Sequence, residues 1–352
     1  MSTELNTEKQ LLNSCLVGSQ WYQIDEADHT EEERLVEEIF NKVRQTSAVP
    51  YMAVRSADGE KLWMTYFRGN ESHLDELLDA MEYIQSNWTG EANVMFPVDI
   101  VMGQDGYGCV FLPIDRESTK PIRSFMPCEE GPRWKIGLAL FRKVQQLHSM
   151  GLTSNGISRS QLRCDPVSGE ITMWLNHTIA MAGEQASAER TDDSDRFFHL
   201  PDFTVGACKR KGDPVRSEQR DIFSAAVGAF YILLHTHPFI GSDFFDRPRS
   251  EYDVHYQNNP KYIFEPYTTN CPGNMALDSM TLMQWDQTVP QLKKLFDQIF
   301  MAVTAPEQHW SSDLECWDVT KWIEALSLDE EKNRNASCAI PQGFTREWQR
   351  LV

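Results

Sequence analysis

Several side chains in this sequence could act as a nucleophile, a base or a metal ligand, but few stand at the spacings that such chemistry needs. Ser158 and Ser160 are not part of a G-x-S-x-G turn, which exposes the nucleophilic serine of many hydrolases. His235 and His237 flank the expected end of an apolar helix, where histidines more often cap or pack than bind a metal. The eight cysteines form no C-x-x-C pair, so we expect reduced cysteines in the core.

Composition narrows the classes of partner and location. The net charge is −19 over 352 residues, which repels phosphate backbones and anionic lipid surfaces. We therefore expect no nucleic-acid partner and no membrane partner. The sequence has no apolar run of the ~18 residues that a membrane span needs, and its polar first residues do not resemble a secretion signal. These features predict a cytoplasmic protein.

The first third of the chain alternates between strand and helix patterns. Two extended runs are joined by Asp58-Gly59, and Asp-Gly between extended runs is a strong hairpin signal. A segment with apolar side chains at helical spacing follows, and then two more extended runs. The strands are expected at 50–56, 61–68, 94–102 and 107–113, and the helix at 71–86.

The rest of the chain is mainly helical in pattern. The segment 221–234 is almost wholly apolar, which predicts a buried helix. A long loop-like insertion at 240–277 is rich in Asn, Pro and Tyr. Further helices are expected at 134–148, 288–303 and 312–327, and a short hairpin at 161–175. Strands grouped before helices predict an α+β fold.

These patterns predict four parts of unequal size. Residues 1–44 are expected as an N-terminal extension that contains a helix, and residues 45–113 as a small strand-rich lobe. Residues 114–328 are expected as a larger helical lobe that carries the insertion 240–277. Residues 329–352 are expected as a C-terminal tail.

The order of elements and several short motifs resemble the two-lobed protein kinases. Asp221-Ile222-Phe223-Ser224 is similar to the sDxxSLG start of the central helix of their large lobe, and 233–239 is similar to the LLxGxxPF ending of that helix. Ala305-Pro306-Glu307 is similar to the close of the lobe. The segment 259–266 is similar to an insertion in bacterial kinase-like proteins that accompany phosphatase-type partners. The resemblance implies a small β-rich N-lobe and a larger α-helical C-lobe.

The resemblance also shows which small-lobe residues of a kinase are missing. A kinase covers the phosphates of ATP with a Gly-rich loop and holds them with a lysine on the third strand. The turn at 45–50 contains no glycine, and alignment of 59–68 with GxxYAVKxYR places Thr65 at the lysine position. Thr65 is neutral and too short to reach a phosphate. A shift in register would bring Lys61 to this position, and Arg55 on the neighbouring strand is the other possible substitute.

Further kinase positions are degenerate in the same way. Glu82 is the candidate for the helix carboxylate that pairs with the kinase lysine, although a solvated helix glutamate is the plainer interpretation. The segment 151–162 is similar to GixHxDlxxxNi, with Gly156 in place of the general base and Gln161 in place of the metal-binding asparagine. Asn176 stands at the spacing of the DFG aspartate. Its neutral amide is a poor ligand for Mg²⁺, so we expect no bound Mg²⁺ and leave ATP binding open.

Two other features bear on these positions. Asp202-Phe203-Thr204 imitates a DFG motif but lies too far after Gly156 for the short hairpin that separates the two sites in kinases. Asp221 is retained, and in kinases its counterpart braces the backbone of the catalytic loop. The basic cluster Lys209–Lys211 is either a docking patch or an ordinary solvated loop.

The leading hypothesis is therefore a pseudokinase, a catalytically inactive kinase-like protein that regulates or scaffolds a protein partner. That partner could be a kinase or phosphatase of the same system. The alternative is an atypical kinase-fold enzyme that performs phosphoryl or nucleotidyl transfer with relocated residues, for which Asp202, Arg55 or Glu82 are available. A third possibility is an α+β interaction protein whose likeness to kinases is accidental.

Overall fold

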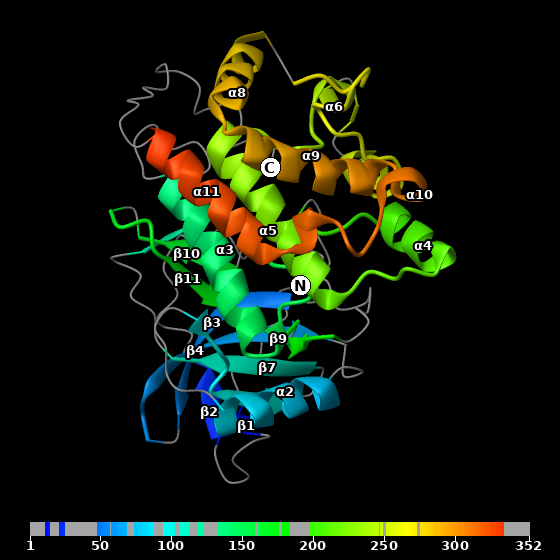
Figure 1. Cartoon of the computed structure of the whole chain (residues 1–352). Helices are drawn as coiled ribbons and strands as arrows, with labels where there is room; N and C mark the ends of the chain where they lie inside the picture. The colour runs from blue at the N-terminus through cyan, green and yellow to red at the C-terminus, as the bar shows by residue number, and fades with distance from the viewer. Residues whose placement is uncertain are drawn as a thin grey trace, which may run out of the picture. The chain divides into compact units, whose positions relative to one another are not determined.

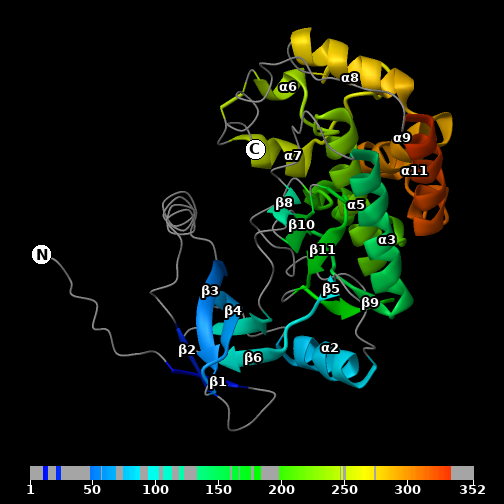
Figure 2. The same ribbon diagram turned by 90° about the vertical axis from the view of Figure 1, so that its left-hand side faces the viewer.

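A computed structural model of the protein divides the chain into two compact units. One unit comprises Met1–Asp115 with Trp174–Ile179, and the other comprises Arg116–Met173 with Ala180–Val352. Figures 1 and 2 show the elements of both. The structure describes residues 11–14, 21–24, 48–56, 58–68, 74–87, 94–102, 106–112, 119–122, 133–158, 161–165, 167–175, 178–183, 198–245, 247–248, 251–272 and 275–333.

The smaller unit is built on a closed antiparallel barrel. Its strands follow the order β1-β2-β3-β4-β7-β6 around the barrel. The Asp58-Gly59 signal is confirmed, because Gly59 has φ +82° and its amide donates to the Ser56 carbonyl at 2.9 Å in the β3–β4 turn. The bounds are β1 (Leu11–Ser14), β2 (Trp21–Ile24), β3 (Ala48–Ser56), β4 (Lys61–Arg68), β5 (Val94–Met95), β6 (Asp99–Met102), β7 (Gly106–Phe111) and α2 (Leu74–Asn87).

The barrel corrects the predicted start of the small lobe. β1 pairs with both β2 and β6, and β2 pairs with β3, so residues 11–14 and 21–24 belong to the sheet rather than to an extension. Closure of a barrel removes the exposed strand edges that an open sheet would leave. Four-residue strands are too short to produce a clear period-two pattern, which is why the sequence did not reveal them. The helix predicted within residues 30–44 lies outside the described residues.

The larger unit is mainly helical, with α5 at its centre. Every residue of α5 except Glu218 is buried, as its apolar sequence predicts. Figure 1 shows α3 beside α5, and α11 packs on α3, where Phe141 of α3 stacks on Trp322 of α11 with ring centroids 4.7 Å apart. The principal helices are α3 (Arg133–Ser149), α4 (Asp202–Lys211), α5 (Ser217–Leu234), α8 (Met275–Gln287), α9 (Pro290–Thr304), α10 (Pro306–His309) and α11 (Val319–Asn333). None of the helices in the described residues is long and apolar enough to cross a membrane.

Short strands in the larger unit hold the segment that follows α3. β10 pairs antiparallel with β11 and with β8, and β12 pairs antiparallel with β9. The β10–β11 pair confirms the hairpin predicted at 161–175. The bounds are β8 (Lys120–Pro121), β9 (Leu152–Thr153), β10 (Leu162–Cys164), β11 (Ile171–Trp174) and β12 (Ala180–Met181).

The insertion at 240–277 is more ordered than a loop. It contains α6 (Ser242–Phe245), α7 (Tyr252–Asn258) and the start of α8. Phe264 stacks on Trp285 with ring centroids 4.4 Å apart, and Tyr262 is fully buried beside Phe230. These aromatic contacts fasten the insertion to the core, a result that its Asn- and Pro-rich composition did not predict.

The last helix also extends past the predicted end of the lobe at residue 328. The buried carboxylate of Asp329 on α11 accepts a hydrogen bond from the Val289 amide at 2.8 Å, just before α9 begins. Asn333 donates from its side-chain amide to the Asp329 carbonyl at 2.9 Å. The start of the predicted tail therefore belongs to the folded unit.

Candidate functional site

The segment after α3 is shaped by one buried carboxylate. Asp221 lies on α5 and is fully buried. Its Oδ2 accepts hydrogen bonds from the Ser154 amide at 2.9 Å and from His148 Nε2 at 3.1 Å, and its Oδ1 accepts from the Gly156 amide at 2.7 Å. Because both oxygens hold groups of the loop or its helix, Asp221 has a positioning role, as its motif predicts.

Gly156 stands where the kinase resemblance places the general base, and its surroundings exclude a side chain. Its φ is +105°, a backbone conformation that residues with a Cβ rarely adopt. A Cβ added there would lie 2.6 Å from His199 Nδ1 and 3.6 Å from Ser224 Oγ. The loop is therefore built around glycine at this position, and the imidazole of His199 fills the adjacent space.

His199 is itself held in place by the larger unit. It is 4% exposed, and its backbone carbonyl accepts a hydrogen bond from the Tyr256 hydroxyl at 2.7 Å. Ser224 of α5 donates to the neighbouring Phe198 carbonyl at 2.7 Å. Sequence reasoning missed His199, and the only signal was its position between the apolar residues Phe198 and Leu200.

Gln161, at the place of the metal-binding asparagine, uses its amide inside the loop. Its Oε1 accepts a hydrogen bond from the Ser158 amide at 2.7 Å, and its Nε2 lies 3.3 Å from Ser154 Oγ. The residue is 2% exposed. The oxygen that would bind a metal is thus engaged by the backbone of its own loop, and the longer side chain of glutamine makes this span possible.

In the smaller unit, Thr65 lies on a buried face of β4. It is 9% exposed and directly opposite Cys109 of β7, where burial raises the pKa of the thiol. Lys61 shares this face but lies four positions earlier, about 13 Å along the strand. Its Nζ lies 5.7 Å from the ring centroid of Trp63. The strand therefore brings Thr65 together with uncharged groups.

The two other small-lobe candidates are also separate from Thr65. Arg55 is the register partner of Lys61, at the end of the hairpin next to its turn. Glu82 is exposed on α2, which supports the interpretation of a solvated helix glutamate. The buried stripe of α2 consists of apolar residues, namely Leu77, Ala80, Met81 and Ile84.

The remaining acidic and basic candidates have local structural roles. Asp202 is the exposed first residue of α4, a position where a negative charge interacts favourably with the helix dipole. The basic cluster Lys209–Lys211 forms the last turn of α4 rather than a loop, and Lys211 Nζ donates to the Trp310 carbonyl at 2.7 Å. Asn176 lies outside the described residues. Within the described part of the chain, no cluster of three or more His, Cys, Asp or Glu residues could hold a metal ion.

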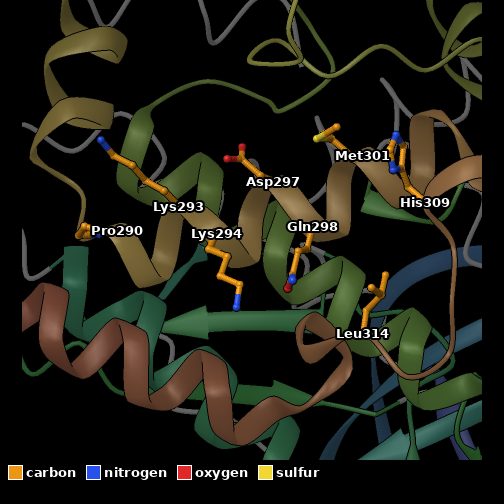
Figure 3. A pocket seen from close by; sticks show the side chains of 8 residues that line it. All are labelled: Pro290, Lys293, Lys294, Asp297, Gln298, Met301, His309 and Leu314. Carbon is orange, nitrogen blue, oxygen red and sulfur yellow. The ribbon is translucent and has the colours of Figure 1, made fainter.

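A shallow groove of about 450 Å³ lies along α9, apart from the loop that Asp221 braces. Figure 3 shows Lys294 and Gln298 on one side of the helix, and Lys293 and Asp297 on the other. The lining carries both signs of charge, since Lys293 and Lys294 are basic and Asp297 is acidic. Lys294 also forms an ion pair with Glu315. Burial raises the pKa of Asp297, and the Tyr262 hydroxyl partly opposes this rise by donating at 3.1 Å. The groove is lined by Pro290, Lys293, Lys294, Asp297, Gln298, Met301, His309 and Leu314.

Comparison with solved structures identifies the fold. The chain is similar to the autoinhibited serine kinase domain of the giant muscle protein titin, with a TM-score of 0.51, 11% identity, and coverage of 87% of this chain and 85% of that one. It also matches Rad53 1–466 in complex with AMP-PNP, with a TM-score of 0.48, 9% identity, and coverage of 80% of this chain and 62% of that one. No protein-family model and no curated protein matches the sequence.

The fold class is thus a two-lobed α+β protein-kinase-like fold, as predicted. The smaller unit corresponds to the β-rich lobe and the larger unit to the helical lobe. At 11% identity the likeness establishes the fold alone, so the chemistry must be argued from this chain's own residues.

Proposed function

We propose that this protein is a pseudokinase that acts by binding a protein partner, without phosphoryl transfer at the loop 151–161. The observation that carries the proposal is the environment of Gly156. Its φ of +105° and the proximity of His199 leave no room for a carboxylate base. A general base must stand within hydrogen-bond reach of the proton that it removes, and glycine has no side chain to do so.

The other kinase positions support the same proposal. Gln161 Oε1 accepts from the Ser158 amide, so it is not directed to a metal. Thr65 is uncharged and lies beside Cys109 and Trp63. The sequence between β2 and β3, residues 25–47, contains no glycine and is rich in Asp and Glu. Such a segment lacks the glycines that allow backbone amides to approach a phosphate closely.

The scaffold itself is retained, which is why binding is the proposed role. Asp221 still makes its three hydrogen bonds, and the aromatic contacts of Phe264 and Tyr262 fix the insertion on the larger unit. A kinase or phosphatase encoded in the same system fits this role, because the motif at 259–266 is similar to one in kinase-like proteins that accompany phosphatase-type partners.

The alternative, an atypical kinase-fold enzyme, has one observation in its favour. His199 places an imidazole next to Gly156, and histidine is the side chain that most often serves as a general base. Its Nδ1 lies 2.6 Å from the place that a Cβ at Gly156 would occupy, and this close fit against the loop supports a packing role for the imidazole.

Thermal unfolding with ATP tests both functions. We expect the melting temperature to be unchanged by ATP with Mg²⁺, and no phosphate to move from γ-labelled ATP to the protein or to generic acceptor proteins. A Mg²⁺-dependent stabilisation of about 2.7 kcal/mol at a hundredfold excess over the dissociation constant would contradict the proposal. Label transfer that is abolished by His199→Gln, but not by the matched surface change His309→Gln, would establish the alternative.

A further inference from the structure

Two adjacent buried side chains at the start of α5 have donor groups that the fold does not use. Gln219 is 2% exposed and Arg220 is 3% exposed. Over the described ranges, neither Gln219 Nε2 nor Arg220 Nε and Nη2 has a hydrogen-bond partner. Buried donors are nearly always paired in folded proteins, so an unpaired group of this kind calls for a physical explanation.

Among the residues that the structure describes, no carboxylate forms an ion pair with the Arg220 guanidinium. Burial lowers the pKa of Arg220 to about 10, and the negative charges of Asp202 and Asp221 oppose this only in part. Asp221 uses its two oxygens for the loop and His148. Asp202 is exposed at the start of α4. Within the described part of the chain, Arg220 is therefore a buried cation without an ion pair.

The geometry of these donors matches an oxyanion. Nε and Nη2 form one edge of the guanidinium, and their parallel N–H groups suit two oxygens of a single anionic centre. Arg220 is the fourth residue of α5, and side chains on a helix lean toward its N-terminus, over the first turn. Gln219 Oε1 accepts from the Arg216 amide at 2.9 Å, which places the Gln219 amide group at the same helix end.

We propose that the first turn of α5 is a binding site for a phosphoryl oxyanion, held by the Arg220 edge, the Gln219 amide and the N-terminus of the helix. A helix N-terminus favours anions because its free N–H groups carry partial positive charge. A phosphoryl group offers three terminal oxygens and close to two negative charges at neutral pH, so it has an acceptor oxygen for each of the three unused donors. A carboxylate has only two oxygens and one charge. This site is independent of ATP binding and of the pseudokinase proposal.

Phosphate titration of the full-length protein tests the site. Thermal unfolding is followed as inorganic phosphate replaces chloride at constant ionic strength, with acetate as the carboxylate control. We expect the melting temperature to rise by about 2 °C for each tenfold increase in phosphate above the dissociation constant, and acetate to have a much smaller effect. Repetition with a phosphoserine peptide and its unphosphorylated form separates a protein-borne phosphoryl group from the free ion.

Three variants decide whether Arg220 and Gln219 are responsible. Gln219→Glu keeps the acceptor for Arg216 and places an internal carboxylate beside Arg220, so we expect a higher melting temperature without phosphate and loss of the phosphate response. Arg220→Lys keeps the positive charge but removes the paired Nε and Nη2 donors. The phosphate concentration needed for the same rise in melting temperature should therefore increase at least tenfold. Arg210→Met removes one exposed basic residue of α4 and should respond like the wild type.

The outcomes that overturn the proposal are equally definite. A phosphate response of wild-type size in Gln219→Glu, or the same response to acetate as to phosphate, would show that the stabilisation is a general effect of anions. Absence of any response in the wild type would also overturn the site. If Arg220→Lys fails to fold, Gln219→Glu still decides the question, because its side chain keeps the length and the hydrogen bond of glutamine.

Discussion

The two units differ in how they hold the residues that the kinase resemblance aligns with catalytic positions. In the loop 151–161 of the larger unit, the substituted residues take part in hydrogen bonding or close packing, as Gly156 and Gln161 do. On β4 of the smaller unit, Thr65 simply joins a buried face beside Cys109. Under the pseudokinase proposal, the loop 151–161 has acquired contacts that depend on its substituted residues, whereas the position of Thr65 has become an ordinary part of a buried strand. The first kind of replacement should be hard to reverse, and the second should tolerate change.

The largest loss of stability is expected when Asp221, which braces the loop 151–161, is replaced. Asp221→Ala removes an acceptor from two buried backbone amides and from His148, so the free energy of unfolding should fall by about 4 kcal/mol. Chemical denaturation measures this loss. Asp221→Asn keeps one acceptor oxygen and should lose about half as much. A loss below about 1 kcal/mol in the alanine variant would show that the loop does not depend on Asp221.

An aspartate introduced at Gly156, the position of the general base in kinases, tests whether the same loop can accept a side chain there. Gly156→Asp must adopt a strained φ and displace His199, so we expect a loss of about 3 kcal/mol and no gain of phosphoryl transfer. Combination with His199→Ala removes the clash but leaves the backbone strain, and should recover only part of the stability. Full stability of Gly156→Asp alone would contradict the steric argument.

Replacement of Gln161 should cause a smaller loss of stability. Gln161→Leu leaves the Ser158 amide without its acceptor in a buried loop, which should lower the free energy of unfolding by about 2 kcal/mol. Gln161→Glu is the matched control, because it keeps the acceptor and loses only the bond to Ser154 Oγ. Equal losses in the two variants would mean that the acceptor at Ser158 is unimportant.

The smallest effect is expected in the smaller unit. Thr65→Val keeps the branched outline of the side chain and removes one hydroxyl from a buried face, so stability should change by no more than about 1 kcal/mol. Thr65→Lys restores the kinase residue type but buries a charge, so it should destabilise the protein without creating binding of ATP with Mg²⁺. The ATP titration described above measures this. Gain of nucleotide binding by Thr65→Lys would show that the rest of the site had been kept.

The sequence predicted those features that depend on local pattern or on a short motif. Asp58-Gly59 predicted its hairpin, the apolar run at 221–234 predicted a buried helix, and Asp221 predicted the brace of the loop. Strands β1 and β2 were missed, because four residues carry too little periodicity. His199 and the unused edge of Arg220 were also missed, since both depend on contacts between residues far apart in the chain.

The hydrogen bond from Val289 to Asp329 has a consequence for where the protein can be shortened. A fragment that stops at residue 328, where sequence patterns end the lobe, would leave the start of α9 without its acceptor although no residue of α9 had been removed. It would also delete the last turn of α11. The larger unit therefore needs its residues up to Asn333. Stability should fall abruptly, rather than gradually, when truncation from the C-terminal side removes Asn333 and the residues before it.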